Sequence, residues 1–314
     1  MTGNGSQDGL SVDPGAPAIE LRDVRKSYEG VAAVKGVSLT VKRGEVFGLV
    51  GPNGAGKTTT VECIEGLRQP DEGSIRVLGM EPAGNRLRLF RHVGVQLQEG
   101  TLHPRVRCLE ALRLFASFHP SPVDGDDLLK AFGLENRKRT FFGDLSAGQK
   151  RRLMVAVALI GDPDLVVLDE PTTGLDPQAR YNFWSYLRTV CATGKTVLLT
   201  THYLEEAEEY CDEIALMDHG EILLVGRPRE ILHQRGLETR ITIEDQDGWA
   251  RSRLEKHPDV RQLEVLGSRL VVYGRREPLS RIFAMNGAPS PLEVRGATLE
   301  DLFLLTTGRD YREE

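Results

Sequence analysis

The chain has 314 residues, of which 40% are hydrophobic and 27% are charged. This length accommodates one large and one small domain, and the composition is that of an ordinary soluble globular protein. The formal net charge of -6 argues against a general nucleic-acid binder, so no nucleic-acid partner is expected. Because the longest apolar run, Leu153 to Ile160, is far shorter than the roughly 18 residues of a membrane span, any membrane role is expected to be peripheral.

Neither the first residues nor the cysteines indicate a secreted protein. Residues 1–17 are rich in Gly, Ser, Asp and Pro and lack the basic start and apolar centre of a secretory signal, so they are predicted to form a disordered tail. The four cysteines form no CxxC pair and have no histidine at metal spacing. We therefore expect reduced thiols in helix or core positions.

From Ile19 to about Arg235, strand-like runs alternate with helical stretches. The opening runs, Ile19 to Val24 and Val37 to Val41, alternate polar and apolar residues as antiparallel strands do. Three later runs are apolar almost throughout: Val46 to Val50, Leu165 to Leu168 and Thr196 to Thr200. Such runs predict a parallel sheet that is covered on both faces. Helical spacing of apolar residues predicts a helical subdomain over about residues 99–160.

After Arg235 the pattern changes to short strands and helices in the order βαββαβ, followed by a last helix. The expected strands are Arg240 to Ile243, Gln262 to Val265, Leu270 to Val272 and Leu292 to Val294, and the expected helices are Trp249 to Lys256 and Leu279 to Met285. This order is typical of a small ferredoxin-like α+β domain. The predicted division is a tail over 1–17, a large α/β domain over 18–235 and an accessory domain over 236–314.

The run Gly51-Pro52-Asn53-Gly54-Ala55-Gly56-Lys57-Thr58-Thr59 directly follows the apolar run that ends at Val50. Glycines let successive backbone N–H groups converge on the phosphates of a nucleotide, and the next helix presents its positive N-terminus to them. Lys57 would reach the β- and γ-phosphates, and Thr58 would supply a hydroxyl to Mg²⁺. A chance glycine-rich turn is the alternative, but the preceding strand and the helical apolar spacing that follows favour a phosphate site.

A second run, Leu165-Val166-Val167-Leu168-Asp169-Glu170-Pro171, is a buried strand that ends in two carboxylates. Strand geometry points adjacent side chains to opposite faces, so the two carboxylates can do different work. Asp169 would hold Mg²⁺, and Glu170 would face the γ-phosphate and polarise an attacking water. The alternative is a charged turn after an apolar strand.

A third run, Leu145-Ser146-Ala147-Gly148-Gln149, precedes the helical stretch Lys150 to Ile160. Ser146 is a good N-cap residue, so its hydroxyl and the first free N–H groups would form a second anion site, unless the cap is purely structural. The cluster Lys150-Arg151-Arg152 is expected to be a solvated helix face.

These motifs, in this order, make residues Ile19 to Arg235 resemble the nucleotide-binding subunit of an ATP-binding cassette (ABC) transporter. The resemblance implies a P-loop NTPase core of the ABC-ATPase type, with a mixed, mostly parallel sheet, an antiparallel β subdomain and a helical subdomain. It also implies ATP and Mg²⁺ as cofactors and a homodimer, or pseudo-dimer, of two stacked subunits. The residues then expected to contact ATP within one subunit are Gly51, Asn53, Gly54, Gly56, Lys57, Thr58 and Thr59, and those expected to contact it from the other subunit are Ser146, Gly148 and Gln149.

The resemblance assigns further roles one position at a time. Tyr28 would stack on adenine, unless it is only a surface tyrosine in a turn. Gln98, favoured over Gln96 by the spacing Val-Gly-Val-Gln-Leu-Gln, would sense Mg²⁺ and the attacking water where a membrane subunit docks. Asp176 would communicate between the two ATP sites, or would only cap the helix that begins at Pro177. His202 would contact the γ-phosphate, although a lone histidine after a strand is usually structural.

One position departs from the commonest family form, LSGGQ, because Ala147 replaces the first glycine. If that position needed a positive φ, alanine would cost roughly 1 kcal/mol and slightly weaken closure. All other catalytic positions match, so the resemblance implies an active ATPase.

Within the family, the chain is most similar to ATPase subunits of bacterial drug and antibiotic exporters, through the runs His202 to Glu208 and, more loosely, Ala297 to Phe303. This likeness implies export of a hydrophobic drug-like compound or lipid through a separate integral membrane permease, with the ATPase at the cytoplasmic side of the membrane. A soluble ABC ATPase with a regulatory or non-transport role is the alternative. The accessory domain could be regulatory, could stabilise a dimer or could bind a partner.

Overall fold

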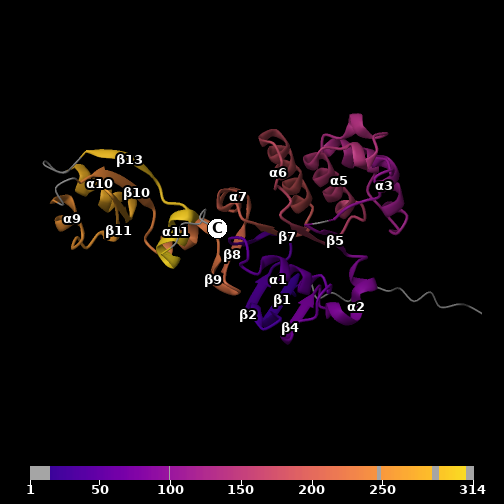
Figure 1. Ribbon diagram of the computed structural model, residues 1–314, viewed down its shortest axis with the longest axis horizontal. Coiled ribbons are helices and arrows are strands. Elements are labelled where there is room, and N and C mark those ends of the chain that lie inside the picture. Colours follow the sequence, from indigo (N-terminus) through magenta and orange to yellow (C-terminus); the bar gives the residue numbers. More distant parts are fainter. Residues whose placement is uncertain (1–14, 99, 246–248, 285–289, 309–314) are drawn as a thin grey trace, which may run out of the picture.

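A six-stranded sheet lies at the centre of the computed structural model, which describes residues 15–98, 100–245, 249–284 and 290–308 (Figure 1). Its strand order is β5-β6-β7-β3-β8-β9, and all neighbours are parallel except β8 and β9. The strands are β3 (Val46–Val50), β5 (Val93–Gln96), β6 (Leu165–Asp169), β7 (Thr196–Thr201), β8 (Glu213–Asp218) and β9 (Glu221–Gly226). Every residue of β3, β6 and β7 is buried, so the predicted parallel sheet with two covered faces is confirmed.

A three-stranded antiparallel sheet covers one face of the central sheet. It contains β1 (Ile19–Tyr28), β2 (Val31–Val41) and β4 (Glu72–Val77), in the order β2-β1-β4. Phe47 and Leu49 of the central sheet share one apolar core with Leu21 and with Ile64 of α1 (Lys57–Ile64). The antiparallel strands predicted at the start of the chain are therefore confirmed.

Helices cover the other face of the sheet. They are α3 (Cys108–Ala116), α4 (Gly125–Ala131), α5 (Ala147–Leu159), α6 (Pro177–Ala192), α7 (Leu204–Tyr210) and α8 (Pro228–Gln234). Helices α3, α4 and α5 pack on one another between β5 and β6 in the sequence, and α3 and α5 lie together beyond β5 in Figure 1. Among the helices in the described ranges, none has the length and apolar character needed to cross a bilayer.

The C-terminal part contains a second, fully antiparallel sheet of order β11-β12-β10-β13. Its elements are β10 (Thr239–Glu244), α9 (Trp249–Leu254), β11 (Val260–Leu266), β12 (Arg269–Gly274), α10 (Arg276–Ala284) and β13 (Pro291–Gly296). The predicted order βαββαβ is confirmed, and the strand order is that of a ferredoxin-like sheet. Helix α9 ends at Leu254 and so is shorter than predicted, and the predicted end of the next helix, Met285, lies outside the described residues.

The last helix, α11 (Leu299–Thr307), packs on α7 and α8 of the large domain. Its residues Leu302 and Phe303 belong to the same apolar core as Leu204 of α7 and Tyr273 of β12. Figure 1 shows α11 between the small sheet and α7. The predicted accessory domain over 236–314 therefore shares a core with the large domain through its last helix. The boundary at residue 235 stays a prediction.

A buried carboxylate, Asp301, fastens α11 to the small sheet. Arg295 of β13 donates two hydrogen bonds to it, of 2.8 and 2.9 Å, and the Tyr273 hydroxyl donates a third of 3.2 Å. The Arg240 Nε of β10 lies 3.5 Å from Asp301 Oδ1. The side chain of Asp301 is only 7% exposed, so these donors replace the water that the carboxylate lost on folding.

We predict that Asp301→Ala lowers the free energy of unfolding by about 3 kcal/mol, because it leaves two arginines and a tyrosine without their shared acceptor. Urea unfolding followed by circular dichroism measures this loss. The control Glu277→Ala breaks the exposed pair between Glu277 and Arg281 and should cost less than about 1 kcal/mol. Equal losses in the two variants would contradict the prediction.

Candidate nucleotide site

The predicted phosphate loop lies between the carboxyl end of β3 and the N-terminus of α1. Two of its glycines have no room for a side chain. A Cβ at Gly51 would lie 2.1 Å from the Met217 carbonyl oxygen, and a Cβ at Gly56 would lie 2.4 Å from the Ala33 carbonyl oxygen. Gly56 also has a φ of +100°, which side-chain-bearing residues avoid. Asn53 and Gly54 form the exposed tip of the loop.

Lys57 is buried beneath this loop, with 5% of its surface exposed. Its Nζ donates hydrogen bonds of 2.8 Å to the carbonyl oxygens of both Gly51 and Pro52. Burial lowers the pKa of the ammonium, while the charges of Glu170 and Asp169 act in the opposite direction. Loop carbonyls thus hold the ammonium at the phosphate loop, next to two carboxylates. Thr58 and Thr59 lie half-buried in the first turn of α1.

Asp169 and Glu170 diverge for a different reason from the one predicted. Strand β6 ends at Asp169, and Glu170 has a left-handed φ of +49°, so a turn and not strand alternation separates the two side chains. The Thr200 hydroxyl connects them, because it donates to Asp169 Oδ1 and accepts a 2.9 Å hydrogen bond from the Glu170 amide. Burial raises the pKa of the Asp169 carboxyl.

Glu170 is the point at which several elements converge. Its Oε1 lies 3.2 Å from His202 Nδ1 and 3.9 Å from Lys57 Nζ, and the Thr173 hydroxyl donates a 3.2 Å hydrogen bond to its Oε2. The contact with His202 has the distance but not the directed geometry of a hydrogen bond. The structure therefore brings together Lys57, Glu170 and His202, which the sequence predicted separately.

Gln98 and Gln96 occupy different environments. Gln98 is exposed, and its Oε1 lies 3.5 Å from the Thr58 hydroxyl, at the limit of a hydrogen bond. Gln96 is buried in β5, and its amide donates to the carbonyls of Leu97 and Asp169. Of the two glutamines, Gln98 is thus the one placed beside the phosphate loop.

Three oxygen donors fit a magnesium ion that arrives with a nucleotide: the Thr58 hydroxyl, the Gln98 amide oxygen and the Asp169 carboxylate. Mg²⁺ usually takes one or two carboxylates, waters and substrate phosphates in place of a cage made only by protein. Within the described ranges, no group of three or more His, Cys, Asp or Glu side chains is placed to hold a metal by itself. These three oxygen atoms therefore suit a metal ion that binds together with a nucleotide.

The basic cluster makes tertiary contacts that were not predicted from its sequence. Lys150-Arg151-Arg152 was expected to be a solvated helix face, and this expectation is wrong. Arg151 and Arg152 are half-buried, and Lys150 lies over the Phe142 ring. Arg151 Nη1 points at the backbone carbonyls of Gln98 and Asp169, at 3.5 and 3.3 Å. Sequence gave no signal for this role, because three adjacent cations look alike without tertiary contacts.

Ser146, Gly148 and Gln149 lie on the first turn of α5. Ser146 caps the helix by accepting a 3.3 Å hydrogen bond from the Gln149 amide, and the Gln149 side chain accepts one of 3.0 Å from the Ser146 amide. Ala147 is the first helical residue and has no positive φ, so the cost considered for alanine does not arise. A Cβ on Gly148 would lie 3.3 Å from the Gly174 carbonyl oxygen, so this turn touches the loop that leads to Asp176.

Asp176 is the N-cap of α6, with its Oδ1 accepting a 2.9 Å hydrogen bond from the Ala179 amide and Pro177 at the first helical position. Asp176 therefore does cap a helix, which was the structural role considered for it. A role between two ATP sites is compatible with it, because Oδ2 is not used by the cap.

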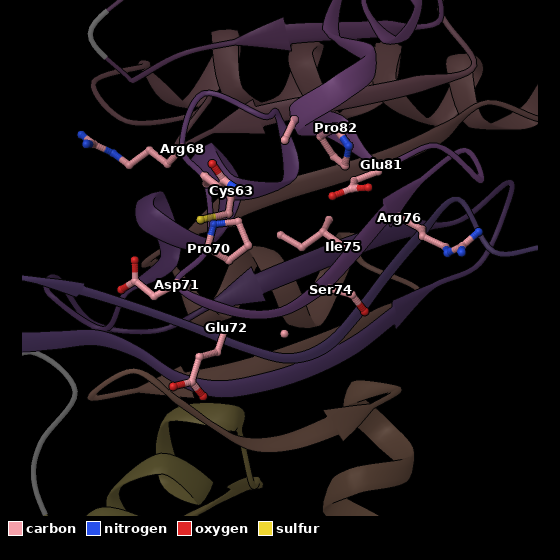
Figure 2. Close-up of a pocket in the computed structure, with 13 residues that line it drawn as sticks. Cys63, Arg68, Pro70, Asp71, Glu72, Ser74, Ile75, Arg76, Glu81 and Pro82 are labelled. Atoms are coloured by element: carbon pink, nitrogen blue, oxygen red, sulfur yellow. The ribbon is translucent and has the colours of Figure 1, made fainter.

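Tyr28 ends β1, and two cations lie over its ring: Lys26 Nζ at 5.7 Å and the Arg68 guanidinium at 5.1 Å. Arg68 also lines a cavity of about 410 Å³ between the end of α1, β4 and the start of α2 (Pro82–Leu89). Figure 2 shows Arg68 and Arg76 on opposite sides of this cavity, with their guanidinium groups pointing away from each other. A stacking adenine would take the place of one of the cations on the Tyr28 ring.

One buried carboxyl was not singled out by the sequence. Glu65, at the end of α1, is 1% exposed, and neither of its oxygens has a hydrogen-bond partner among the described residues. Burial, with smaller contributions from Asp169 and Glu62, raises the pKa of Glu65 to about 8. Glu65 is therefore mostly protonated at neutral pH.

The parallel sheet, the phosphate loop and the acidic end of β6 define a P-loop nucleotide-hydrolysing protein. The family profile described as "ABC transporter" matches residues 34–173. The chain is 41% identical over 303 residues to Nod factor export ATP-binding protein I of Cupriavidus pinatubonensis, covering 94% of this chain and 92% of that protein. It is also 41% identical to the protein of the same name from Burkholderia orbicola, covering 97% and 100% of the two chains. The chain belongs to the ABC transporter family and is an ATP-binding subunit with ATPase activity.

Solved structures agree with this family. The ATP-binding subunit of an ABC transporter superposes with a TM-score of 0.65 at 32% identity, covering 70% of this chain and 93% of that one. An ATP-binding cassette in its ADP conformation gives a TM-score of 0.59 at 25% identity, covering 69% and 94%. About 70% of this chain superposes in each case, and binding of adenine nucleotide follows from the family.

We predict that Gly56→Ala abolishes measurable ATP binding, because the new Cβ meets the Ala33 carbonyl and cannot accept a φ of +100° without strain. Titration with a fluorescent ATP analogue measures the affinity. The control Gly54→Ala also changes a glycine of positive φ, but nothing lies within 4 Å of its Cβ. The strain of placing alanine in this left-handed conformation should cost only about 1 kcal/mol. Equal ATP affinity of the two variants would refute the explanation by steric clash at residue 56.

We predict that Glu65→Gln stabilises the protein increasingly as pH rises. The pKa of Glu65 is raised from 4.5 to about 8 in the folded state, so folding loses stability as pH rises through this window. The glutamine variant does not ionise, and its advantage should grow by about 3 kcal/mol between about pH 5 and about pH 7.5. Denaturant unfolding at both pH values measures the free energy of unfolding of each protein, with Glu62→Gln as the control variant. A difference between Glu65→Gln and the unchanged protein that does not vary with pH would contradict the prediction.

Proposed function

We propose that this chain is the ATP-hydrolysing subunit of an exporter and that it works with an integral membrane permease on a separate chain. The observation that carries the proposal is the convergence of Lys57, Glu170 and His202 at the phosphate loop. Relatives that cover nearly the whole chain are named for export. The subunit would act at the cytoplasmic face of the membrane as a peripheral protein.

In the proposed reaction, the amides of the phosphate loop and the Lys57 ammonium bind the β- and γ-phosphates. Glu170 orients and polarises the attacking water, and His202, 3.2 Å from Glu170, contacts the γ-phosphate. Mg²⁺, when bound with ATP, neutralises phosphate charge, and Thr58, Gln98 and Asp169 would hold it. Tyr28 would hold the adenine. The buried contacts of Glu170 fix its carboxylate before ATP arrives.

A second copy of the cassette would complete the site. Ser146 is exposed on the N-terminal turn of α5, where free amides and the helix dipole favour an anion. We propose that Ser146, Gly148 and Gln149 bind the γ-phosphate held by the partner, and that Asp176 contacts the partner's site. Closure then depends on the γ-phosphate, and hydrolysis loosens the dimer.

An apolar groove of about 450 Å³ between α2, β5, α3 and α5 is the proposed docking site for a helix of the permease. Leu87 is 89% exposed and Phe118 is 67% exposed, and both line this groove. Strand β5 lines it as well and leads directly to Gln98. The exposed Arg91 favours an acidic residue on the docking helix. A partner seated here would be connected to the phosphate site through β5.

The cargo is proposed to be a hydrophobic drug-like compound or a lipid. This part of the proposal rests on the likeness of the chain to ATPase subunits of bacterial drug and antibiotic exporters. Relatives named for Nod factor export support export in general.

The test is co-purification of tagged Glu170→Gln from detergent-solubilised membranes of its native cell with Mg-ATP present. The variant keeps ATP binding and loses hydrolysis, so it should accumulate in the closed state and retain the permease. Recovery of a multi-span membrane protein in a fixed ratio is expected. Recovery of a soluble dimer alone would refute the exporter proposal and favour a non-transport ABC ATPase.

A second variant tests the groove. Phe118→Asp in the Glu170→Gln background places a charge in the proposed apolar contact and should reduce recovery of the permease at least about tenfold. Affinity for ATP should stay unchanged, because Phe118 lies in the groove and not at the phosphate loop. Val225→Asp, at an exposed apolar residue of β9 outside the groove, is the matched control.

A further inference from the structure

Arg151 connects three elements of the nucleotide site through one nitrogen. It lies on α5, five residues after Ser146, and its Nη1 is 3.3 Å from the Asp169 carbonyl oxygen and 3.5 Å from the Gln98 carbonyl oxygen. Asp169 ends β6, and Gln98 follows β5, its parallel neighbour in the sheet. The guanidinium therefore sits at the carboxyl edge of two adjacent strands.

The charge of Arg151 suits this position. Arginine stays protonated in proteins, so it donates to both carbonyls at any physiological pH. Burial lowers the pKa of the guanidinium, and the nearby charges of Glu170 and Asp169 favour the cation. Nη1 carries two N–H groups, one for each carbonyl, and both contacts are long for hydrogen bonds.

The neighbouring arginine provides a comparison within the same helix. Arg152 is also half-buried, and its Nη1 donates a 2.9 Å hydrogen bond to the Phe132 carbonyl at the end of α4. That bond joins two helices of the helical subdomain. The bonds of Arg151 join the helical subdomain to the central sheet.

We propose that Arg151 is a positioning residue that couples movement of α5 to the placement of Gln98 and of the end of β6. When the N-terminus of α5 approaches ATP on a second copy, the guanidinium moves both carbonyls with it. Arg151 contacts backbone oxygens, so it acts through Gln98 and Asp169 and not on the substrate. The inference rests on the roles proposed for Gln98 and Ser146.

The test compares steady-state ATP hydrolysis by the full chain and its variants. Arg151→Met should lower kcat about tenfold, which is about 1.4 kcal/mol, and leave KM within about twofold. Arg151→Lys keeps a cation on a shorter side chain, which reaches the two carbonyls less well, and should therefore recover only part of the rate. Arg152→Met removes a matched arginine and should leave kcat within about twofold, even if it lowers the melting temperature.

The double variant Gln98→Ala/Arg151→Met is the sharper readout. Because Arg151 is proposed to act partly through Gln98 and partly through Asp169, the loss of kcat in the double variant should be clearly smaller than the product of the two single losses, whereas independent effects would multiply. Multiplying effects, or equal kcat values for Arg151→Met and Arg152→Met, would overturn the inference. If Arg151→Met does not fold, a wild-type kcat for Arg151→Lys overturns it. A wild-type kcat for Gln98→Ala would instead refute the role proposed for Gln98, and the inference would fail with it.

Discussion

The carboxyl edge of the central parallel sheet is the constraint on which the rest of the structure depends. Strands β3, β5, β6 and β7 run in the same direction, so the chain leaves each of them at the same edge. Lys57, Gln98, Glu170 and His202 each follow one of these strands and meet there, although they are far apart in the sequence. Burial of the strands on both faces keeps this edge rigid.

Buried charge at this edge is balanced by fixed polar partners. The Lys57 ammonium donates hydrogen bonds to two loop carbonyls. The Thr200 hydroxyl donates to the Asp169 carboxylate and accepts a hydrogen bond from the Glu170 amide. These groups are thus desolvated, and fixed polar partners within the chain take the place of water around them. Glu65 is different, because its buried carboxyl has no such partner and is accommodated by protonation.

The two parts of the chain are joined by more than a linker. Helix α11 shares its core with α7, and the Leu299 amide donates a 3.1 Å hydrogen bond to Glu208 of α7. At its other side, Asp301 binds the small sheet through Arg295 and Tyr273. Helix α7 begins two residues after His202, so α11 connects the C-terminal sheet to a helix that follows closely on this residue.

The phosphate loop, the acidic strand end, the alternation of strands and helices and the order βαββαβ could all be predicted from residue order alone. Each of these features depends on local spacing and on the period of burial. Four features became visible only in the folded chain: the left-handed turn at Glu170, the contacts of Arg151, the burial of Glu65 without a hydrogen-bond partner among the described residues, and the packing of α11 on α7. These features depend on which groups meet in space. Residue type and spacing do not predict such contacts between side chains that are far apart in the sequence.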